Sequence, residues 1–284
     1  MGGVAGPELA DAVSRAGALG TLTAGPTNSA DDLRRHTAAA TERVGIGTLA
    51  WRLAAEPEIL DAALEAQPVA VAISAGDPAP YAARVRAAGI PLLVQVSSAE
   101  AARAAAGAGA DFVVAQGTDA GGHTGPVGTL PLLEAVLAAV DVPVLAAGGI
   151  ASGRGLAGVL AMGAAGAWIG TRFAATREAL GGDEKKRRIV AARETDTVYT
   201  RVYDVAKRIP WPPEYPGRAL RDEFTERWHG REDELEAHGE QDVTYVYAGT
   251  AVGAIDDVPP AGELVERLAA EAERLLARFV EGSP

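Results

Sequence analysis

Cysteine is absent from the 284 residues of this chain. Its absence excludes disulfide bonds and thiolate metal ligands, and it is typical of cytoplasmic proteins, so we expect a cytoplasmic location. Long apolar runs are also lacking, since none reaches the roughly 18 residues that suggest a membrane span. The opening segment MGGVAGPELADAVSRAG has no basic stretch followed by an apolar block, so it does not resemble a secretory signal. We therefore expect no membrane association.

Basic residues are fewer than acidic ones, with 26 Lys and Arg against 38 Asp and Glu and a formal net charge of −12. Because nucleic-acid-binding proteins usually present a basic surface, we expect no nucleic-acid partner. Solubility is the simplest explanation of the negative charge. The four histidines are scattered along the chain and there is no thiolate, so we predict no metal site.

Short apolar segments alternate with longer alanine-rich segments through residues 1–172. Each short segment is apolar throughout, which is typical of strands in a parallel sheet covered by helices. The expected strands are Gly20–Thr23, Val44–Leu49, Val69–Ile73, Leu92–Val96, Phe112–Ala115, Val142–Ala146 and Ala167–Gly170. Gly17, Gly89 and Gly107 stand where helices are expected to end. Strand followed by helix, repeated, indicates an α/β architecture with right-handed crossovers.

Two α/β folds are compatible with these strands. A TIM-type (β/α)8 barrel has eight strands, so the series would lack its first strand, which would have to precede Met1. The alternative is an open, doubly wound sheet. We favour the barrel because the glycine-rich motifs follow the last strands, where barrels place phosphate sites.

The alternation stops after Arg172. Residues 173–247 are rich in charge and include the proline-rich segment RIPWPPEYPGR, so we expect a mostly helical insertion. The segment PAGELVERLAAEAERLLARFV then has the periodicity of an amphipathic helix, expected to be the last helix of the barrel ring. The predicted division is a barrel of residues 1–172 and 248–284 with a small helical cap domain of residues 173–247.

Two glycine-rich turns follow neighbouring strands late in the barrel pattern. In VPVLAAGGIASGRG a strand leads into Gly148 and Gly149, and in GAWIGTRF the next strand leads into Gly170 and Thr171. Glycine lets backbone N–H groups face an oxyanion, and the start of a following helix adds a positive dipole end. The pair predicts a phosphate site; the alternative is two tight turns that bind nothing.

Gly153, Gly155 and Gly158 match the dinucleotide-binding pattern G-x-G-x-x-G. That pattern requires the glycines to bridge a strand and a helix. Here the strand ends several residues earlier, and the glycines lie mainly inside the expected helix. We interpret them as a sign of close helix packing and predict no dinucleotide fold.

The segment VVAQGTDAGGHTG, residues 113–125, places a histidine in a glycine-rich loop behind a strand. In a barrel, such loops carry the catalytic residues. Histidine suits proton transfer near neutral pH, so we predict that His123 is catalytic, a surface histidine without a role being the alternative. Gly121 and Gly122 allow the loop to lie flat against a planar ligand. The remaining histidines, expected to be structural, are His36, His229 and His238.

Four motifs in order along the chain resemble the nitronate monooxygenase family, formerly called 2-nitropropane dioxygenases. They are MGGVAGPELADAVSRAGALGTL, SAGDPAPYAARVRAAGI, AQGTDAGGHTG and PVLAAGGIASGRGLAGVLAMGAAGAWIGTRF. Weaker similarity follows around VYAGTAVGAIDDVPPAGELVERL. The resemblance implies an FMN-binding TIM barrel with a helical cap domain.

The resemblance also implies roles for single residues. Gly148, Gly149, Gly170 and Thr171 would hold the FMN phosphate, Gly2 and Gly3 would face the isoalloxazine, and Gln95 and Gln116 would lie near its polar edge. Gln95 could equally be a strand-end amide that satisfies a neighbouring loop. His123 would abstract the α-proton of a nitroalkane or position the nitronate, which flavin and O2 oxidise to a carbonyl compound and nitrite. Asp119 stands where the family has a glutamate and is expected to support the loop.

The sequence leaves two alternatives to nitronate oxidation. The first is a flavin-dependent enoyl-acyl-carrier-protein reductase using NADH, whose related barrel shares the Ala-Gly-Gly-His loop. The negative charge of this chain disfavours it, because the carrier protein is acidic. The second is a barrel that binds a phosphate-bearing ligand without catalysis. The expected partners are a small-molecule substrate and O2, and a homodimer is a possible assembly.

Overall fold

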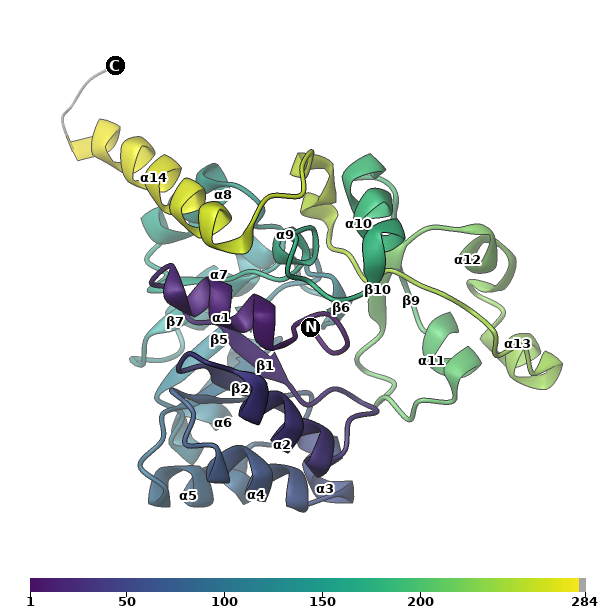
Figure 1. Cartoon of the computed structure of the whole chain (residues 1–284), viewed down its shortest axis with the longest axis horizontal. Helices are drawn as coiled ribbons and strands as arrows, with labels where there is room; N and C mark the ends of the chain where they lie inside the picture. Colours follow the sequence, from purple (N-terminus) through teal and green to yellow (C-terminus); the bar gives the residue numbers. More distant parts are fainter. Residues whose placement is uncertain (281–284) are drawn as a thin grey trace.

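The computed structural model describes residues 1–280, and its main feature is a curved parallel sheet of seven strands (Figure 1). The strands are β1 (Thr21–Thr23), β2 (Gly45–Leu49), β3 (Val71–Ser74), β4 (Leu92–Val96), β5 (Phe112–Gln116), β7 (Val144–Ala147) and β8 (Gly166–Trp168). Each overlaps a segment expected from the sequence, so all seven expected strands are confirmed.

The strands are arranged in the order β1-β2-β3-β4-β5-β7-β8, so strands that follow one another in this sheet are neighbours in space. A doubly wound sheet reverses its strand order, and this sheet does not. The fold is therefore a TIM-type barrel, as predicted. It is open between β8 and β1, because no strand among residues 1–280 pairs with both of them.

Helices follow most strands and cover the outside of the sheet (Figure 1). They are α1 (Pro7–Arg15), α2 (Ala30–Ala39), α3 (Ala50–Ala55), α4 (Glu58–Glu65), α5 (Ala79–Ala87), α6 (Ala99–Ala108), α7 (Thr129–Leu137), α8 (Gly153–Ala161) and α9 (Thr171–Ala174). Ser29 starts α2 with a capping box, since its side chain accepts from the Asp32 amide and Asp32 accepts from the Ser29 amide. The expectation that a helix ends at Gly107 is wrong. The helix continues to Ala108, and Gly109, at φ +95°, supplies the left-handed end.

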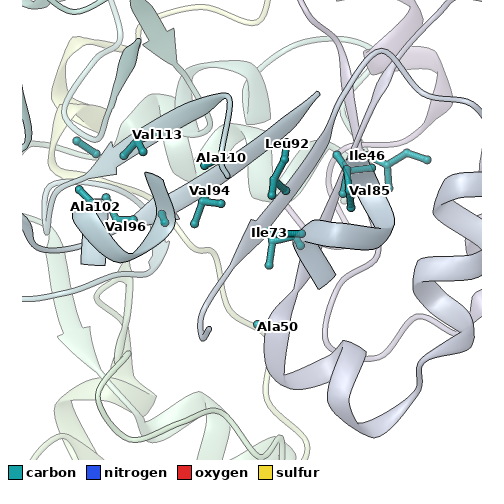
Figure 2. Close-up of a cluster of buried hydrophobic side chains, with 14 of the residues drawn as sticks. Ile46, Ala50, Ile73, Val85, Leu92, Val94, Val96, Ala102, Ala110 and Val113 are labelled. Atoms are coloured by element: carbon teal, nitrogen blue, oxygen red, sulfur yellow. The ribbon is translucent and has the colours of Figure 1, made fainter. Parts of the chain in front are cut away.

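The main core lies between the sheet and these helices (Figure 2). Ile46, Ile73 and Leu92 project from the strands and are at most 1% exposed. They pack with Val85 of α5 and Ala102 of α6. Because neighbouring residues of a strand face opposite sides, a second, smaller cluster fills the inner face of the sheet. It contains Ala70, Leu93, Val114 and Ala147.

The helix α14 (Ala261–Val280) packs against α8 and α1, which are the helices on either side of the opening in the barrel. This confirms that it is the last helix of the ring. At its contact with α8, the Gly153 amide donates to Glu271 Oε2 at 2.8 Å. A Cβ on Gly153 would lie 2.4 Å from the Cβ of Glu271. The interpretation as helix packing is therefore confirmed for Gly153 and wrong for Gly155 and Gly158, because an added Cβ on Gly155 meets only Ile150 and one on Gly158 meets nothing within 4 Å.

The segment after α9 forms the green elements to the right of the sheet in Figure 1. They are α10 (Gly182–Ala191), β9 (Thr197–Thr200), α11 (Val202–Lys207), β10 (Gly217–Leu220), α12 (Glu223–Trp228) and α13 (Glu232–His238). Besides these helices there is a three-stranded antiparallel sheet in the order β6-β10-β9. Its strand β6 (Gly122–His123) comes from the loop behind β5. No helix within residues 1–280 combines the length and apolar character needed to cross a bilayer.

Candidate active site

Two glycine turns lie side by side at the C-terminal edge of the parallel sheet. The strands β7 and β8 end in register at Ala147 and Trp168, and Gly148 and Gly170 follow shortly after them. Gly148 and Gly149 have φ values of +103° and +70°, a region that side chains other than glycine rarely adopt. A Cβ on Gly148 would lie 2.8 Å from the Ala120 amide nitrogen. The turn behind β7 therefore needs glycine for both conformation and space.

The chemistry of these turns suits a phosphate. Among residues 1–280, the backbone amides of Gly148, Gly149 and Gly170 have no hydrogen-bond acceptor. Thr171 adds a hydroxyl that accepts from the Gly249 amide at 3.0 Å and still has a proton to donate. Free N–H groups that converge from neighbouring turns form an oxyanion site. The residues present thus fit the phosphate of a nucleotide cofactor.

The first residues of the chain lie at the same edge, between the ends of β1 and β8. A Cβ on Gly2 would lie 3.1 Å from Gly25, which follows β1. On the other side, the Met1 sulfur lies 3.4 Å from the position of a Cβ on Gly170. Gly3 has φ +70°. The structure therefore places Met1 against the glycine turn behind β8 and Gly2 against the turn behind β1, with Gly3 following in a left-handed conformation.

Gln95 and Gln116 stand on the neighbouring strands β4 and β5. The Gln95 side-chain amide donates to the Gln116 side-chain oxygen at 2.7 Å. This bond uses one donor of Gln95 and one acceptor site of Gln116, so each side-chain amide can still form further hydrogen bonds. Gln116 also pairs in register with Ala147, the residue before the Gly148–Gly149 turn. The two glutamines thus lie at the same edge of the sheet as the glycine turns, on the two strands that precede β7 in the strand order.

The loop behind β5 is fixed by the segment Ala248–Thr250. A Cβ on Gly121 would lie 2.7 Å from the Gly249 amide nitrogen, so the two chains need glycine to approach this closely. Asp119 accepts from the Thr129 amide at 2.8 Å and from the Thr250 hydroxyl at 3.3 Å. The expectation that Asp119 supports the loop is confirmed by these bonds.

The carboxyl group of Asp119 is held ionised by its surroundings. Burial raises its pKa, but the hydrogen bonds from Thr129 and Thr250 and the nearby Arg218 guanidinium outweigh burial, so the pKa is lowered. Arg218 in turn donates to the Thr118 carbonyl at 2.6 Å and to the Thr118 hydroxyl at 3.2 Å. The loop is therefore held from both sides before it reaches His123.

His123 forms a buried pair with Asp204, which is the third residue of α11. The imidazole Nε2 lies 3.0 Å from each carboxylate oxygen of Asp204. Their side chains are 7% and 3% exposed. Because a carboxylate only accepts hydrogen bonds, Nε2 is the nitrogen that donates to Asp204, and Nδ1 is the nitrogen left free for another contact. Nδ1 has no hydrogen-bond partner within the described part of the chain and is not completely buried.

Aromatic side chains enclose this pair. Trp211 stacks on the His123 ring with 3.6 Å between centroids and 9° between planes. Trp51 meets Trp211 edge-on at 5.4 Å. Tyr247 contacts the imidazole edge-on at 5.2 Å and donates to Asp204 Oδ1 at 3.3 Å. Burial, followed by the Asp204 charge, raises the pKa of Tyr247 well above its ordinary value, so its hydroxyl stays protonated.

Sequence reasoning missed Asp204, Trp211 and Tyr247. Asp204 is one of 38 acidic residues, and no motif distinguishes it. Trp211 lies in the proline-rich segment that we assigned to the cap without a role. A tryptophan between prolines was an available signal, because rigid loops often carry contact residues. Pairing of β6 with β10 brings these residues to His123.

The other histidines lie outside this site. His36 is on α2, and His229 and His238 are exposed in the cap segment. Within residues 1–280, no group of three or more His, Asp or Glu side chains is placed to hold a metal ion.

Comparison with known proteins relates the chain to one protein family. The family model described as nitronate monooxygenase matches residues 51–271. A relative in Neurospora crassa named nitronate monooxygenase is 32% identical over 276 residues, covering 83% of this chain and 73% of the relative. A relative in Rhodococcus jostii, named (3aS,4S,5R,7aS)-5-hydroxy-7a-methyl-1-oxo-octahydro-1H-indene-4-carboxyl-CoA dehydrogenase, is 37% identical over 207 residues. That match covers 72% of this chain and 58% of the relative, so this chain spans less than two thirds of its length.

Solved structures agree with this relationship. FabK from Thermotoga maritima superposes with a TM-score of 0.86 and 29% identity, covering 99% of this chain and 93% of that one. Nitroalkane oxidase from Streptomyces ansochromogenes superposes with a TM-score of 0.81 and 30% identity, covering 98% of this chain and 95% of that one. Both likenesses extend over the barrel and the segment after α9.

Proposed function

The chain belongs to the nitronate monooxygenase family, and from this premise we propose that it is an FMN-dependent enzyme that oxidises alkyl nitronates and nitroalkanes with O2 to a carbonyl compound and nitrite. One observation carries the proposal. His123, which pairs with Asp204 of α11, stands in the loop that the segment Ala248–Thr250 connects to the glycine turns behind β7 and β8. A base and an oxyanion site therefore share one edge of the sheet.

The unpaired amides of Gly148, Gly149 and Gly170 support FMN binding, with the Thr171 hydroxyl as a further donor to the phosphate. The remaining FMN contacts that we propose come from Gly2, Gly3, Gln95, Gln116, Gly121 and Gly122. Bound FMN supplies the acceptor for the electrons of an electron-rich nitronate. The protein has to bind the substrate beside it, generate the nitronate where the substrate is neutral, and limit the access of water.

In this proposal His123 is the base. Its Nδ1 accepts the α-proton of the nitroalkane, leaving the nitronate anion and an imidazolium. The Asp204 carboxylate faces Nε2 and stabilises the positive charge that forms on the ring. Trp211 and Tyr247 hold the imidazole in one plane and exclude water from its buried side. A base of this kind contributes about 10²- to 10⁴-fold to the rate.

The test compares two substrates in one variant. We expect H123A to retain FMN and to lose about 10²- to 10⁴-fold in kcat/KM with nitroethane, because proton abstraction is lost. Pre-formed ethyl nitronate needs no proton abstraction and should be oxidised with a smaller loss. Oxygen consumption measures both reactions, and H229A, which removes an exposed histidine outside the site, is the control. Unchanged nitroethane turnover in H123A would remove the base assignment.

Anaerobic NADH distinguishes the proposal from the reductase alternative. A nitronate oxidiser should lose its FMN absorbance slowly when NADH is added. Rapid bleaching would contradict nitronate oxidation as the main activity. Purified protein that stays colourless after FMN is added would instead favour a barrel without this catalysis.

A further inference from the structure

A cavity of about 440 Å³ lies between α11 and α13, outside the glycine turns and the proposed FMN contacts. Its volume falls in the range of about 300–1,000 Å³ that is usual for small-molecule sites. Apolar side chains line part of it, including those of Val205, Ile209 and Leu235. Charged groups line the rest. The cavity can therefore accept a molecule with an apolar body and one polar end.

Arg201, at the start of α11, is the unusual residue of this cavity. Its Nε is completely buried and has no hydrogen-bond partner. Within the described part of the chain, its guanidinium forms no ion pair or hydrogen bond of any kind. Buried donors are almost always paired, because an unpaired one keeps the full cost of losing its contact with water. The Nη1 and Nη2 groups are not completely buried, so they are the donors that an acceptor in the cavity can reach.

The other arginine of the cavity is already satisfied by the protein. With the Gln241 amide turned so that its oxygen faces Arg208, that oxygen accepts from Arg208 Nε at 3.2 Å and from Nη2 at 3.1 Å. Three acidic residues, Asp204, Glu236 and Glu240, also line the cavity. They would repel a ligand with several negative charges. One unpaired arginine among three carboxylates favours a ligand with a single negative charge.

We propose that this cavity binds a small organic monocarboxylate. The carboxylate pairs with the Arg201 guanidinium, whose planar fork matches it, and the apolar chain lies along Val205, Ile209 and Leu235. This site is separate from the proposed FMN contacts but shares Asp204 with the His123 pair. A molecule bound there would contact the residue that holds the proposed base.

Calorimetric titration of the FMN-loaded protein with hexanoate tests the proposal. Hexanoate should bind saturably with one site per chain. R201M should weaken binding roughly tenfold to hundredfold, the loss expected for a charge-assisted pair. R221M is the matched control, because Arg221 is an exposed arginine of the same segment that does not line the cavity, and it should bind as the unmodified protein does.

Several outcomes would overturn the proposal. The unmodified protein could fail to bind hexanoate saturably, or R201M could bind hexanoate as tightly as the unmodified protein does. A third such outcome is that inorganic phosphate binds as tightly as hexanoate. Thermal unfolding checks that R201M is folded. If R201M does not fold, R201K replaces it in the test, because lysine keeps the positive charge but lacks the planar guanidinium. Hexanoate binding by R201K as tight as that of the unmodified protein would again overturn the proposal. The titration measures heat rather than turnover, so its result is independent of the nitronate assay.

Discussion

At the scale of single residues, the feature that matters most is the pairing of His123 with Asp204. Nε2 faces both carboxylate oxygens at 3.0 Å, which leaves Nδ1 as the acceptor. Trp211 and Tyr247 prevent rotation of the ring, because one stacks on it and the other contacts its edge. The pairing thus fixes the orientation of a loop histidine, as the proposed role of general base requires.

Asp204→Asn tests this pairing, since it preserves size and removes charge. We expect kcat/KM with nitroethane to fall roughly tenfold to hundredfold, because the imidazolium loses a charge-assisted hydrogen bond. Oxidation of ethyl nitronate should fall less, because no proton has to be abstracted. Oxygen-consumption kinetics with both substrates provide the measurement. D233N, at an exposed aspartate on α13, is the control and should have the kcat/KM of the unmodified protein with both substrates. Equal losses of kcat/KM with both substrates in D204N would contradict a role of Asp204 in proton transfer.

At the scale of elements, two contacts between distant segments organise the molecule. The two residues of β6 pair with β10, which aligns His123 with Gly217. Close to the opening of the barrel, α8 packs against α14 at Gly153. The helix contact depends on close approach of the two backbones, because a side chain at Gly153 would meet Glu271 and Ala272 of α14.

Gly153→Ala tests the helix contact. The added Cβ would lie 2.4 Å from the Glu271 Cβ and 2.8 Å from the Ala272 amide nitrogen. We expect the free energy of unfolding to fall by about 1–3 kcal/mol, the usual cost of overpacking. Gly158→Ala is the control on the same helix, because nothing lies within 4 Å of its added Cβ. It should be neutral or stabilise the protein by up to about 1 kcal/mol. Urea denaturation measures both, and equal effects would argue against close packing at Gly153.

At the scale of the whole molecule, the barrel is open between β8 and β1, and residues from both ends of the described chain lie there. Residues 1–3 lie between the two end strands at one edge of the sheet, and α14 covers the outside between α8 and α1. The connection from α1 across to β2 is fixed by Asp11. Its carboxylate accepts from the Thr41 amide, the Thr41 hydroxyl and the Glu42 amide at 2.8, 2.7 and 3.1 Å.

Asp11 links the stability of the molecule to pH. Burial raises the pKa of Asp11, but the hydrogen bonds from Thr41 and Glu42 outweigh burial and lower it. Because the folded-state pKa is lowered, the carboxylate stabilises the fold above its ordinary pKa of about 4. That contribution is lost as the pH falls through the folded-state value.

We therefore expect D11N to lower the free energy of unfolding by about 1–3 kcal/mol at pH 7, because the negative charge and one of the two acceptor oxygens are lost. The difference from the unmodified protein should shrink below about pH 4. Denaturation curves at several pH values measure it, with D242N, at an exposed aspartate, as the control. A difference that does not depend on pH would contradict the role of the ionised carboxylate.

Local patterns were sufficient to identify the parallel strands, the glycine turns behind β7 and β8 and the position of His123. Each of these depends on residues close together in the chain: an apolar run, a glycine that permits positive φ, or a loop directly after a strand. The same patterns predicted a mostly helical cap and missed its antiparallel sheet, because β9 and β10 are short and β10 also pairs with a two-residue strand from another part of the chain.

The partners of His123 could come only from the folded chain. Asp204 is 81 residues away in sequence, and Trp211 and Tyr247 lie in other segments of the cap region. Their contacts arise because β10 pairs with β6 and draws the cap onto the loop behind β5. A strand pairing of this kind gains its energy from two distant segments together, so neither segment carries a signal of it alone. The unpaired Arg201 became visible for the same reason, since a missing partner can be recognised only after packing has placed its neighbours.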